Sequence, residues 1–443
     1  MKLNRRHLLK ITGASAALCG THTLAQTTSN PDVVILGAGA AGIAAAQELR
    51  AAGISFLVLE ATNRVGGRAF TESATFGVPF DHGAHWVQNG RRNRYFNIAN
   101  QLEGRFYKAP EEYKIFAEKG FASRIETEQL WLAYDDAIEA ISTAGRQRKD
   151  VAPSEIVSSE NIWSKTAGFA IGPWEMGKDM TDFSCLDWWN SADSEDWYYG
   201  PGYGRLVADY AAGLPVVFNT PATRIDWSGP DVRVETATGA IRTQAVIVTA
   251  STGVLANEGI SFTPALPVEK QQSFHDVPMG NYNHIALLFS EDIFGMGEDG
   301  YLLHKVSGSG EAFGALTNAS GTGLAYCDVG GSFARDLEAA GHAVAADFVV
   351  MKLRQLIGSD VDRYLVSSAV TSWGKNEFVR GCYASAKPGA YLQRDVLRQS
   401  VGDRIFFAGE ACHDDLWATV GGADRSGSDT ALAVIRKLRL ANQ

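Results

Sequence analysis

A glycine-rich turn between a short apolar strand and a helix constrains the fold of this chain more than any other stretch. Gly37, Gly39 and Gly42 form the pattern G-x-G-x-x-G, between the β-branched run 33–36 and the helix-forming run 43–52. Gly37 permits the tight turn, Gly39 lets the backbone approach a pyrophosphate, and Gly42 lets the helix pack on the strand. The helix N-terminus then offers free N–H groups to phosphate. The pattern predicts a dinucleotide site in an α/β domain.

The residues after this unit indicate which dinucleotide is bound. A second apolar strand is expected at 55–59, and Glu60 at its end is placed to accept hydrogen bonds from ribose hydroxyls. The stretch "ATNRVGGRAF" follows, with Gly67 between Arg64 and Arg68. It brings permissive backbone and a guanidinium group near the pyrophosphate, where Arg binds better than Lys. We interpret this as favouring a flavin over a nicotinamide dinucleotide.

The size and charge of the chain limit the remaining possibilities. Its 443 residues, 45% of them hydrophobic, are too many for one simple core, so two or three domains are expected. The formal net charge of −10 repels a phosphate backbone, and no basic tract interrupts the sequence. Nucleic acid is therefore not an expected partner, and oligomeric state is not indicated.

The N-terminus is typical of an export signal. Arg5 and Arg6 precede a short apolar stretch, and Ala25 offers a plausible cleavage site, so residues 1–25 are interpreted as a twin-arginine signal peptide. An amphipathic N-terminal helix is the alternative. No later stretch is apolar over the roughly 18 residues that a membrane-spanning helix needs. The sequence thus predicts a periplasmic protein without a transmembrane segment.

Cysteine and histidine residues show no metal or disulfide framework. Five cysteines are scattered along the chain, which allows one disulfide but assigns none. His82, His85 and His413 do not have zinc-ligand spacing, so no metal site is expected.

Four ordered segments resemble the flavin-containing amine oxidase family, which includes monoamine and polyamine oxidases. They cover nearly the whole chain after the signal and are residues 32–68, "FDHGAHWVQNG" at 80–90, 220–255, and "RIFFAGEACHDDLWATVGGADRSGSDTALAVI" at 404–435. The resemblance implies bound FAD and an α/β fold, in which a Rossmann-like FAD-binding domain is interleaved with a substrate domain of mixed sheet plus helices.

The resemblance also implies the domain boundaries. The FAD-binding domain would comprise 31–95, 200–270 and 380–443, and the substrate-binding domain would comprise 96–199 and 271–379. Within the substrate domain, apolar periodicity predicts helices at 126–145 and 335–357 and a strand at 365–373.

Several C-terminal residues would contact the cofactor if the resemblance holds. Glu410 would contact the ribityl chain, and Thr419 and Val420 would present backbone to the pyrimidine ring. A helix from about Ala423 would direct its positive N-terminus at the flavin, which stabilises a reduced, anionic ring. Ala222 lies in the middle cofactor segment.

The segment "WGKNEFVRGCY" carries the predicted substrate cage. By resemblance, Trp373 begins this segment and Tyr383 stands against the flavin face, where an aromatic ring can hold an amine nitrogen. Cys382 matches a monoamine oxidase cysteine that bonds covalently to FAD; a buried free thiol is the alternative. The second cage wall falls at Thr419, with Trp417 two residues earlier as a candidate for the missing ring.

Two departures from the family pattern affect the chemistry. His284 occupies the position of a lysine that holds a water at the flavin, and it could act as a base or in reoxidation; a packed histidine is the alternative. Gln88 replaces an acid found in some polyamine oxidases, which argues mildly against a diamine or polyamine substrate.

The expected function is FAD-dependent oxidation of an amine C–N bond by hydride transfer, giving an imine and then an aldehyde or ketone. Oxygen or a periplasmic electron carrier would accept the electrons. An L-amino-acid oxidase is one alternative, with Arg105, Arg124 or Arg380 binding the carboxylate. A flavin desaturase or isomerase, an amine dehydrogenase and a non-catalytic flavin-retaining binding protein are the others.

Overall fold

The computed structural model describes residues 30–441 except 111–112, 118–119, 193–194 and 308–310. The predicted signal peptide at 1–25 lies outside the described residues. In the part of the chain that is described, no helix is both long and apolar enough to cross a membrane.

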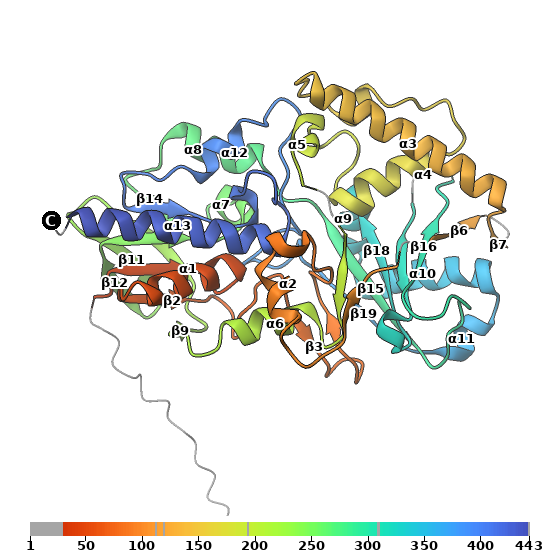
Figure 1. The fold of residues 1–443 in the computed structure, drawn as a ribbon, viewed down its shortest axis with the longest axis horizontal. Coiled ribbons are helices and arrows are strands. Elements are labelled where there is room, and N and C mark those ends of the chain that lie inside the picture. Colours follow the sequence, from red (N-terminus) through yellow and green to blue (C-terminus); the bar gives the residue numbers. More distant parts are fainter. Residues whose placement is uncertain (1–29, 111–112, 118–119, 193–194, 308–310, 442–443) are drawn as a thin grey trace, which may run out of the picture.

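A five-stranded parallel sheet forms the first layer of the molecule. Its strand order is β20, β13, β1, β2, β9, with bounds Ile405–Phe407, Ala245–Val248, Val33–Leu36, Phe56–Leu59 and Val216–Val217. Helices α1 (Ala40–Ala51) and α13 (Val420–Ala441) lie side by side along one face, where small alanine side chains allow close packing (Figure 1). The strands come from all three ranges predicted for the FAD-binding domain, although the domain boundaries themselves stay a prediction.

The other face of the parallel sheet is covered by a smaller sheet. This sheet has the order β12, β11, β10, β14, with bounds Gly239–Thr243, Val232–Thr236, Ala222–Asp226 and Ser261–Thr263. Its alternating residues Ile225, Val232 and Val234 join the same hydrophobic core as Val34 and Leu36 of β1. Alternation places one face of these strands on the core and leaves the other face polar.

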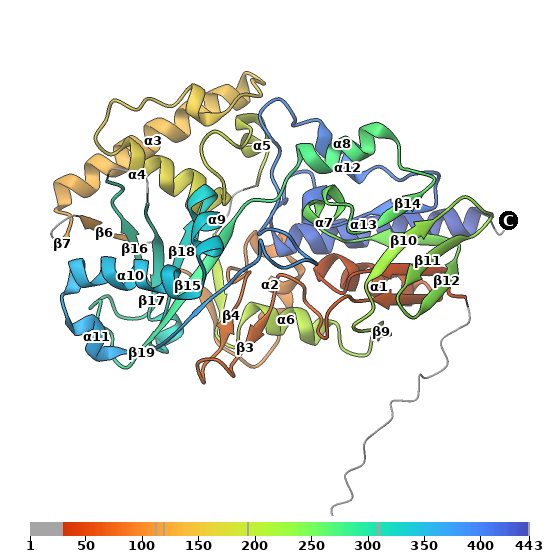
Figure 2. The same cartoon turned by 180° about the vertical axis from the view of Figure 1, so that it is seen from behind.

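A seven-stranded sheet forms the other half of the molecule. Its order is β19, β15, β18, β17, β16, β6, β7, with bounds Leu365–Val370, Tyr282–Phe289, Leu324–Gly330, Gly314–Thr317, Gly300–His304, Tyr113–Ala117 and Gly120–Phe121. All neighbours are antiparallel except β16 and β6. Helices α9 (Gly331–Ala340), α10 (His342–Ile357) and α11 (Asp360–Tyr364) pack against one face (Figure 2).

A helical layer lies across one end of this sheet. It contains α3 (Arg124–Arg146), α4 (Ser164–Phe169), a π-helix (Ala170–Met176) and α5 (Cys185–Trp189) (Figure 1). The remaining α-helices and β-strands of the described residues are α2 (Arg94–Ala99), α6 (Tyr203–Tyr210), α7 (Thr252–Ala256), α8 (Val268–Asp276), α12 (Gln393–Arg398), β3 (Thr71–Glu72), β4 (Phe80–Asp81), β5 (Phe106–Lys108) and β8 (Trp197–Tyr199).

Most predicted elements are found, with two corrections. The helix predicted at 126–145 is α3, which begins with a capping box between Ser123 and Glu126. The single helix predicted at 335–357 is wrong: Gly341, with φ +100°, separates α9 from α10. The predicted strand 365–373 ends at Val370, as β19.

Candidate functional site

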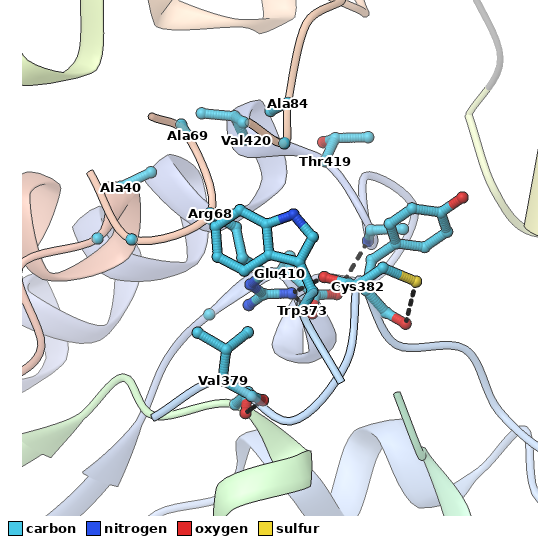
Figure 3. A pocket seen from close by; sticks show the side chains of 18 of the residues that line it. Ala40, Arg68, Ala69, Ala84, Trp373, Val379, Cys382, Glu410, Thr419 and Val420 are labelled. Carbon is cyan, nitrogen blue, oxygen red and sulfur yellow. Dashed lines mark hydrogen bonds and ion pairs between the residues drawn. The ribbon is translucent and has the colours of Figure 1, made fainter. Parts of the chain in front are cut away.

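A cavity of about 1300 Å³ lies between the parallel sheet and the seven-stranded sheet. Every residue predicted for the site lines it except Gly42; those that line it are Gly37, Gly39, Glu60, Gly67, Arg68, Ala222, His284, Trp373, Cys382, Tyr383, Glu410, Trp417, Thr419 and Val420. Figure 3 shows the central part, with Trp373 between Val379 on one side and Val420 on the other.

The glycine turn after β1 leaves space beside a helix N-terminus. A Cβ on Gly42 would lie 1.9 Å from the carbonyl oxygen of Gly37, so Gly42 permits close packing of α1 on the turn. A Cβ on Gly39 would meet no protein atom within 4 Å, and no side chain caps α1 at that residue. Free N–H groups facing open space suit a pyrophosphate. The turn therefore fits the dinucleotide that the sequence predicts.

Glu60 is held in place at the end of β2. Its carboxylate accepts hydrogen bonds from the Ala38 N–H at 2.7 Å and from the Thr62 N–H and hydroxyl at 2.8 and 2.7 Å. A carboxylate has about four lone-pair sites, so capacity remains for a ribose hydroxyl. The predicted contact is compatible with this geometry and stays a prediction.

Arg68 joins three segments rather than standing free beside a pyrophosphate. Its Nη1 donates to Glu410 Oε1 at 2.8 Å and to the Cys382 carbonyl oxygen at 2.7 Å. Glu410 Oε2 accepts from the backbone N–H groups of Ala384 at 3.3 Å and Ala418 at 3.1 Å (Figure 3). The place of Arg68 near the pyrophosphate stays a prediction, and the ion pair holds residues 382–384 against the start of α13.

Trp373 and Tyr383 are both fixed by hydrogen bonds to backbone carbonyl groups. Trp373 Nε1 donates to the His82 oxygen at 2.8 Å, and the Tyr383 hydroxyl donates to the Glu175 oxygen at 2.8 Å. Burial raises the pKa of Tyr383 well above its usual value, so the phenol stays neutral. Two immobile aromatic rings therefore border the centre of the cavity.

The Cys382 thiol is enclosed between two glycines. A Cβ on Gly177 would lie 2.8 Å from its sulfur, and one on Gly280 would lie 3.2 Å away. Burial raises the pKa of Cys382 to about 12, and the thiolate is the reactive form of cysteine. These surroundings favour the alternative of a buried free thiol. The other described cysteines, Cys185, Cys327 and Cys412, are also free.

Trp417 lies in the wall between the cavity and α3. The Arg394 guanidinium is 4.8 Å from its ring centroid, and the ring belongs to a core cluster with Ile141 of α3 and Met176 of the π-helix. Its Nε1 is buried without a hydrogen-bond partner among the described residues. Trp417 thus lines the cavity on one side and packs against α3, the π-helix and Arg394 on the other.

His284 does not have the geometry of a free base. Its Nδ1 lies 2.5 Å from Asp328 Oδ1, and its Nε2 lies 2.9 Å from the Gly83 carbonyl oxygen. A carbonyl only accepts, so Nε2 must carry a proton, and Nδ1 shares a second proton with the carboxylate. Burial opposes protonation, but Asp328 outweighs it and raises the pKa of His284. The prediction of His284 as base is corrected because neither nitrogen has a free lone pair.

The sequence did not indicate Asp328, and it did not show which aromatic side chains of the substrate half face the cavity. Asp328 is fully buried and stands opposite His284 in the β15–β18 register. The aromatic lining includes Trp86, Tyr113, Trp131, Trp174, Trp188 and Tyr301. Aromatic residues are ordinary core residues in a sequence, so only the fold separates lining rings from packed ones.

Few cations reach the cavity. Among the described residues that line it there is no lysine, and the arginines are Arg64, Arg68 and Arg380. Of the arginines proposed for a substrate carboxylate, Arg105 is exposed and paired with Glu298, and Arg124 is exposed beside Glu128; only Arg380 lines the cavity. No group of three metal-ligating side chains occurs in the described residues.

Comparison with known proteins identifies relatives along nearly the whole chain. Residues 40–435 match the model of the family described as flavin containing amine oxidoreductase. Polyamine oxidase 2 of Arabidopsis thaliana is 28% identical over 441 residues, which cover 90% of this chain and 87% of that protein. Lysine-specific histone demethylase 1 homolog 2 of the same plant is 25% identical over 434 residues, 91% of this chain and 58% of that protein. This chain spans 30% to 58% of the length of the demethylase homologues that it matches.

Solved structures share the fold. Cyclohexylamine oxidase from Brevibacterium oxydans superposes with a TM-score of 0.76 at 22% identity, covering 93% of this chain and all of that one. Putrescine oxidase bound to putrescine gives 0.76 at 20% identity, with 92% and 99% covered.

Proposed function

This chain belongs to the family of flavin-containing amine oxidoreductases, and on that premise we propose that it oxidises the C–N bond of an amine with an apolar or aromatic tail. The cofactor is FAD, and the residues that would hold it include Gly39, Glu60 and the start of α13. The supporting observation is that one cavity contains both these cofactor-binding residues and the aromatic side chains of the substrate half, and that no lysine among the described residues lines it. When bound, FAD takes a hydride from the carbon attached to nitrogen.

The residues of this chain bind and orient the amine. The fixed rings of Trp373 and Tyr383 present apolar, electron-rich surfaces to the nitrogen and exclude water. Removal from water disfavours a charged ammonium group, and His284 has no free lone pair to accept its proton. The site therefore selects the neutral amine from solution. Water then hydrolyses the released imine to an aldehyde or ketone.

An amino acid substrate receives less support than a simple amine. A substrate carboxylate needs a cation, and Arg105 and Arg124 are paired with acids on the surface. Arg380 is exposed and lies in the part of the cavity lined by Val379 and Ser251. The aromatic residues proposed to bind the amine tail come instead from the substrate half. The oxidation of L-amino acids is the second candidate, and Arg380 is the feature that favours it.

The electron acceptor and location complete the proposal. We propose export by the twin-arginine signal at residues 1–25, which places the protein in the periplasm. Oxygen or a periplasmic carrier then accepts the electrons. Stopped-flow mixing of the reduced protein with oxygen distinguishes the two, because a slow reaction excludes the oxidase.

Anaerobic titration of the purified flavoprotein tests the proposed function. Benzylamine and n-alkylamines should bleach the flavin absorbance and yield an aldehyde, whereas L-leucine and L-phenylalanine should not. Bleaching by the amino acids alone would establish the second candidate. No bleaching by any of these compounds would contradict both and favour a non-catalytic flavin-binding protein.

A further inference from the structure

A π-helix forms one wall of the cavity. It runs from Ala170 to Met176, contains Pro173, and ends at Gly177 in the left-handed conformation. Three consecutive residues, Trp174, Glu175 and Met176, line the cavity. Consecutive residues of an α-helix point about 100° apart, and the wider π-turn reduces that angle, so neighbours share a face. The π-helix therefore places several neighbouring side chains in the wall of the cavity.

Two glycines seat this helix on the seven-stranded sheet. A Cβ on Gly314 of β17 would lie 2.0 to 2.5 Å from three atoms of the Trp174 indole. A Cβ on Gly330 of β18 would lie 1.5 Å from the Pro173 carbonyl oxygen. Neither glycine has a positive φ, so what the two positions require is the absence of a side chain. The indole therefore lies directly on the backbone of β17.

Trp174 stands between the predicted amine site and the far side of the cavity. The next residue, Glu175, accepts the hydrogen bond from the Tyr383 hydroxyl at 2.8 Å. On the other side, the Trp174 ring centroid is 6.4 Å from that of Tyr301 and 6.0 Å from that of Tyr113, both edge-on. The indole thus lies between Tyr383 and the rings of Tyr301 and Tyr113, and all four side chains line the same cavity.

We propose that Trp174 sets the upper size of the amine tail, because its indole fills the part of the cavity in front of Gly314 on β17. This inference rests on the proposed function and adds to it the residue that determines substrate size. Removing the indole opens a slot between the π-helix and Gly314. Adding a methyl group at Gly314 has the opposite effect: β17 is held by its neighbours β16 and β18, so the indole moves into the cavity.

The experiment compares benzylamine with the longer 4-phenylbenzylamine in the flavin-loaded protein. The ratio of kcat/KM, longer over shorter amine, should rise about tenfold in Trp174→Ala and fall on the order of fivefold in Gly314→Ala. Trp227→Ala, which removes a tryptophan directly after β10 and outside the cavity, should leave the ratio unchanged. Flavin content reports whether each variant is folded.

The dissociation constants of both amines, from the shift of the oxidised flavin spectrum, give the same ratio without turnover. A merely structural role of Trp174 and Gly314 would move both variants in the same direction, which overturns the inference. A change below about twofold in Trp174→Ala also overturns it. If neither amine binds or bleaches the wild-type protein, the proposed function fails instead.

Discussion

A buried ion pair between Asp187 and Arg394 joins the helical layer to the last quarter of the chain. Arg394 Nη2 and Nε donate to the two carboxylate oxygens at 2.5 and 3.1 Å, and Nη1 donates to the Ala411 carbonyl oxygen at 2.7 Å. Asp187 also accepts from the Ala386 N–H at 2.7 Å. Asp187 is fully buried and Arg394 is 3% exposed, so solvent does not screen the pair.

Replacing Arg394 with Met leaves the Asp187 carboxylate buried with one N–H donor. We expect the free energy of unfolding to fall by about 3–5 kcal/mol, because an uncompensated buried charge is the main cost. The double variant Asp187→Leu with Arg394→Met removes both charges and should recover all but about 1–2 kcal/mol, provided the apolar pair fills the space. The pair would then specify geometry more than it adds stability.

Urea unfolding followed by tryptophan fluorescence measures both variants against the wild type, at equal flavin loading. The exposed pair between Arg354 and Asp362 on the surface gives a matched control, and Arg354→Met should cost less than about 1 kcal/mol. A loss for Arg394→Met as small as this control would refute the reasoning. So would a double variant as unstable as the single one.

Three further predictions concern the cofactor and the chemistry. Because the neutral amine is bound, kcat/KM should rise about tenfold per pH unit up to the pKa of the amine near 10, in wild type and His284→Asn alike. The pKa of His284 is raised, so a break above about pH 6.5 that the variant loses would contradict this. Gly39→Ala should fold but not retain FAD, whereas Gly42→Ala should lower thermal stability as well, as judged by circular dichroism and flavin content. Acid precipitation should release the flavin from wild type and Cys382→Ala equally, and a flavin adduct on a wild-type peptide would disprove it.

Local sequence signals predicted the cofactor half well. The turn at Gly37, the helix after it and Glu60 all belong to one continuous strand–helix–strand unit, and backbone requirements of that kind can be recognised in a sequence without a fold. The error at 335–357 has the same local origin. Apolar periodicity runs through Gly341, and the pattern alone does not show that its backbone turns away from the helix.

The chemistry of the substrate half depended on strand register. His284 could be placed on a strand, but its partner Asp328 is brought opposite it only by the pairing of β15 with β18. The same holds for Trp174, which becomes a cavity residue because Gly314 lies under its ring. No sequence spacing encodes contacts between such distant segments, so the sequence could not show that both ring nitrogens of His284 are hydrogen-bonded or that Trp174 faces the cavity.

The route of the chain through the parallel sheet affects how the protein is made. Strand β20 and helix α13 complete the sheet and its helical face, yet both are synthesised after all the other elements of this sheet and its helical face. A nascent chain that stops at α12 would contain the glycine turn after β1, but α1 would lack α13, the helix that packs against it. The dinucleotide site therefore becomes complete only after β20 and α13 have been synthesised.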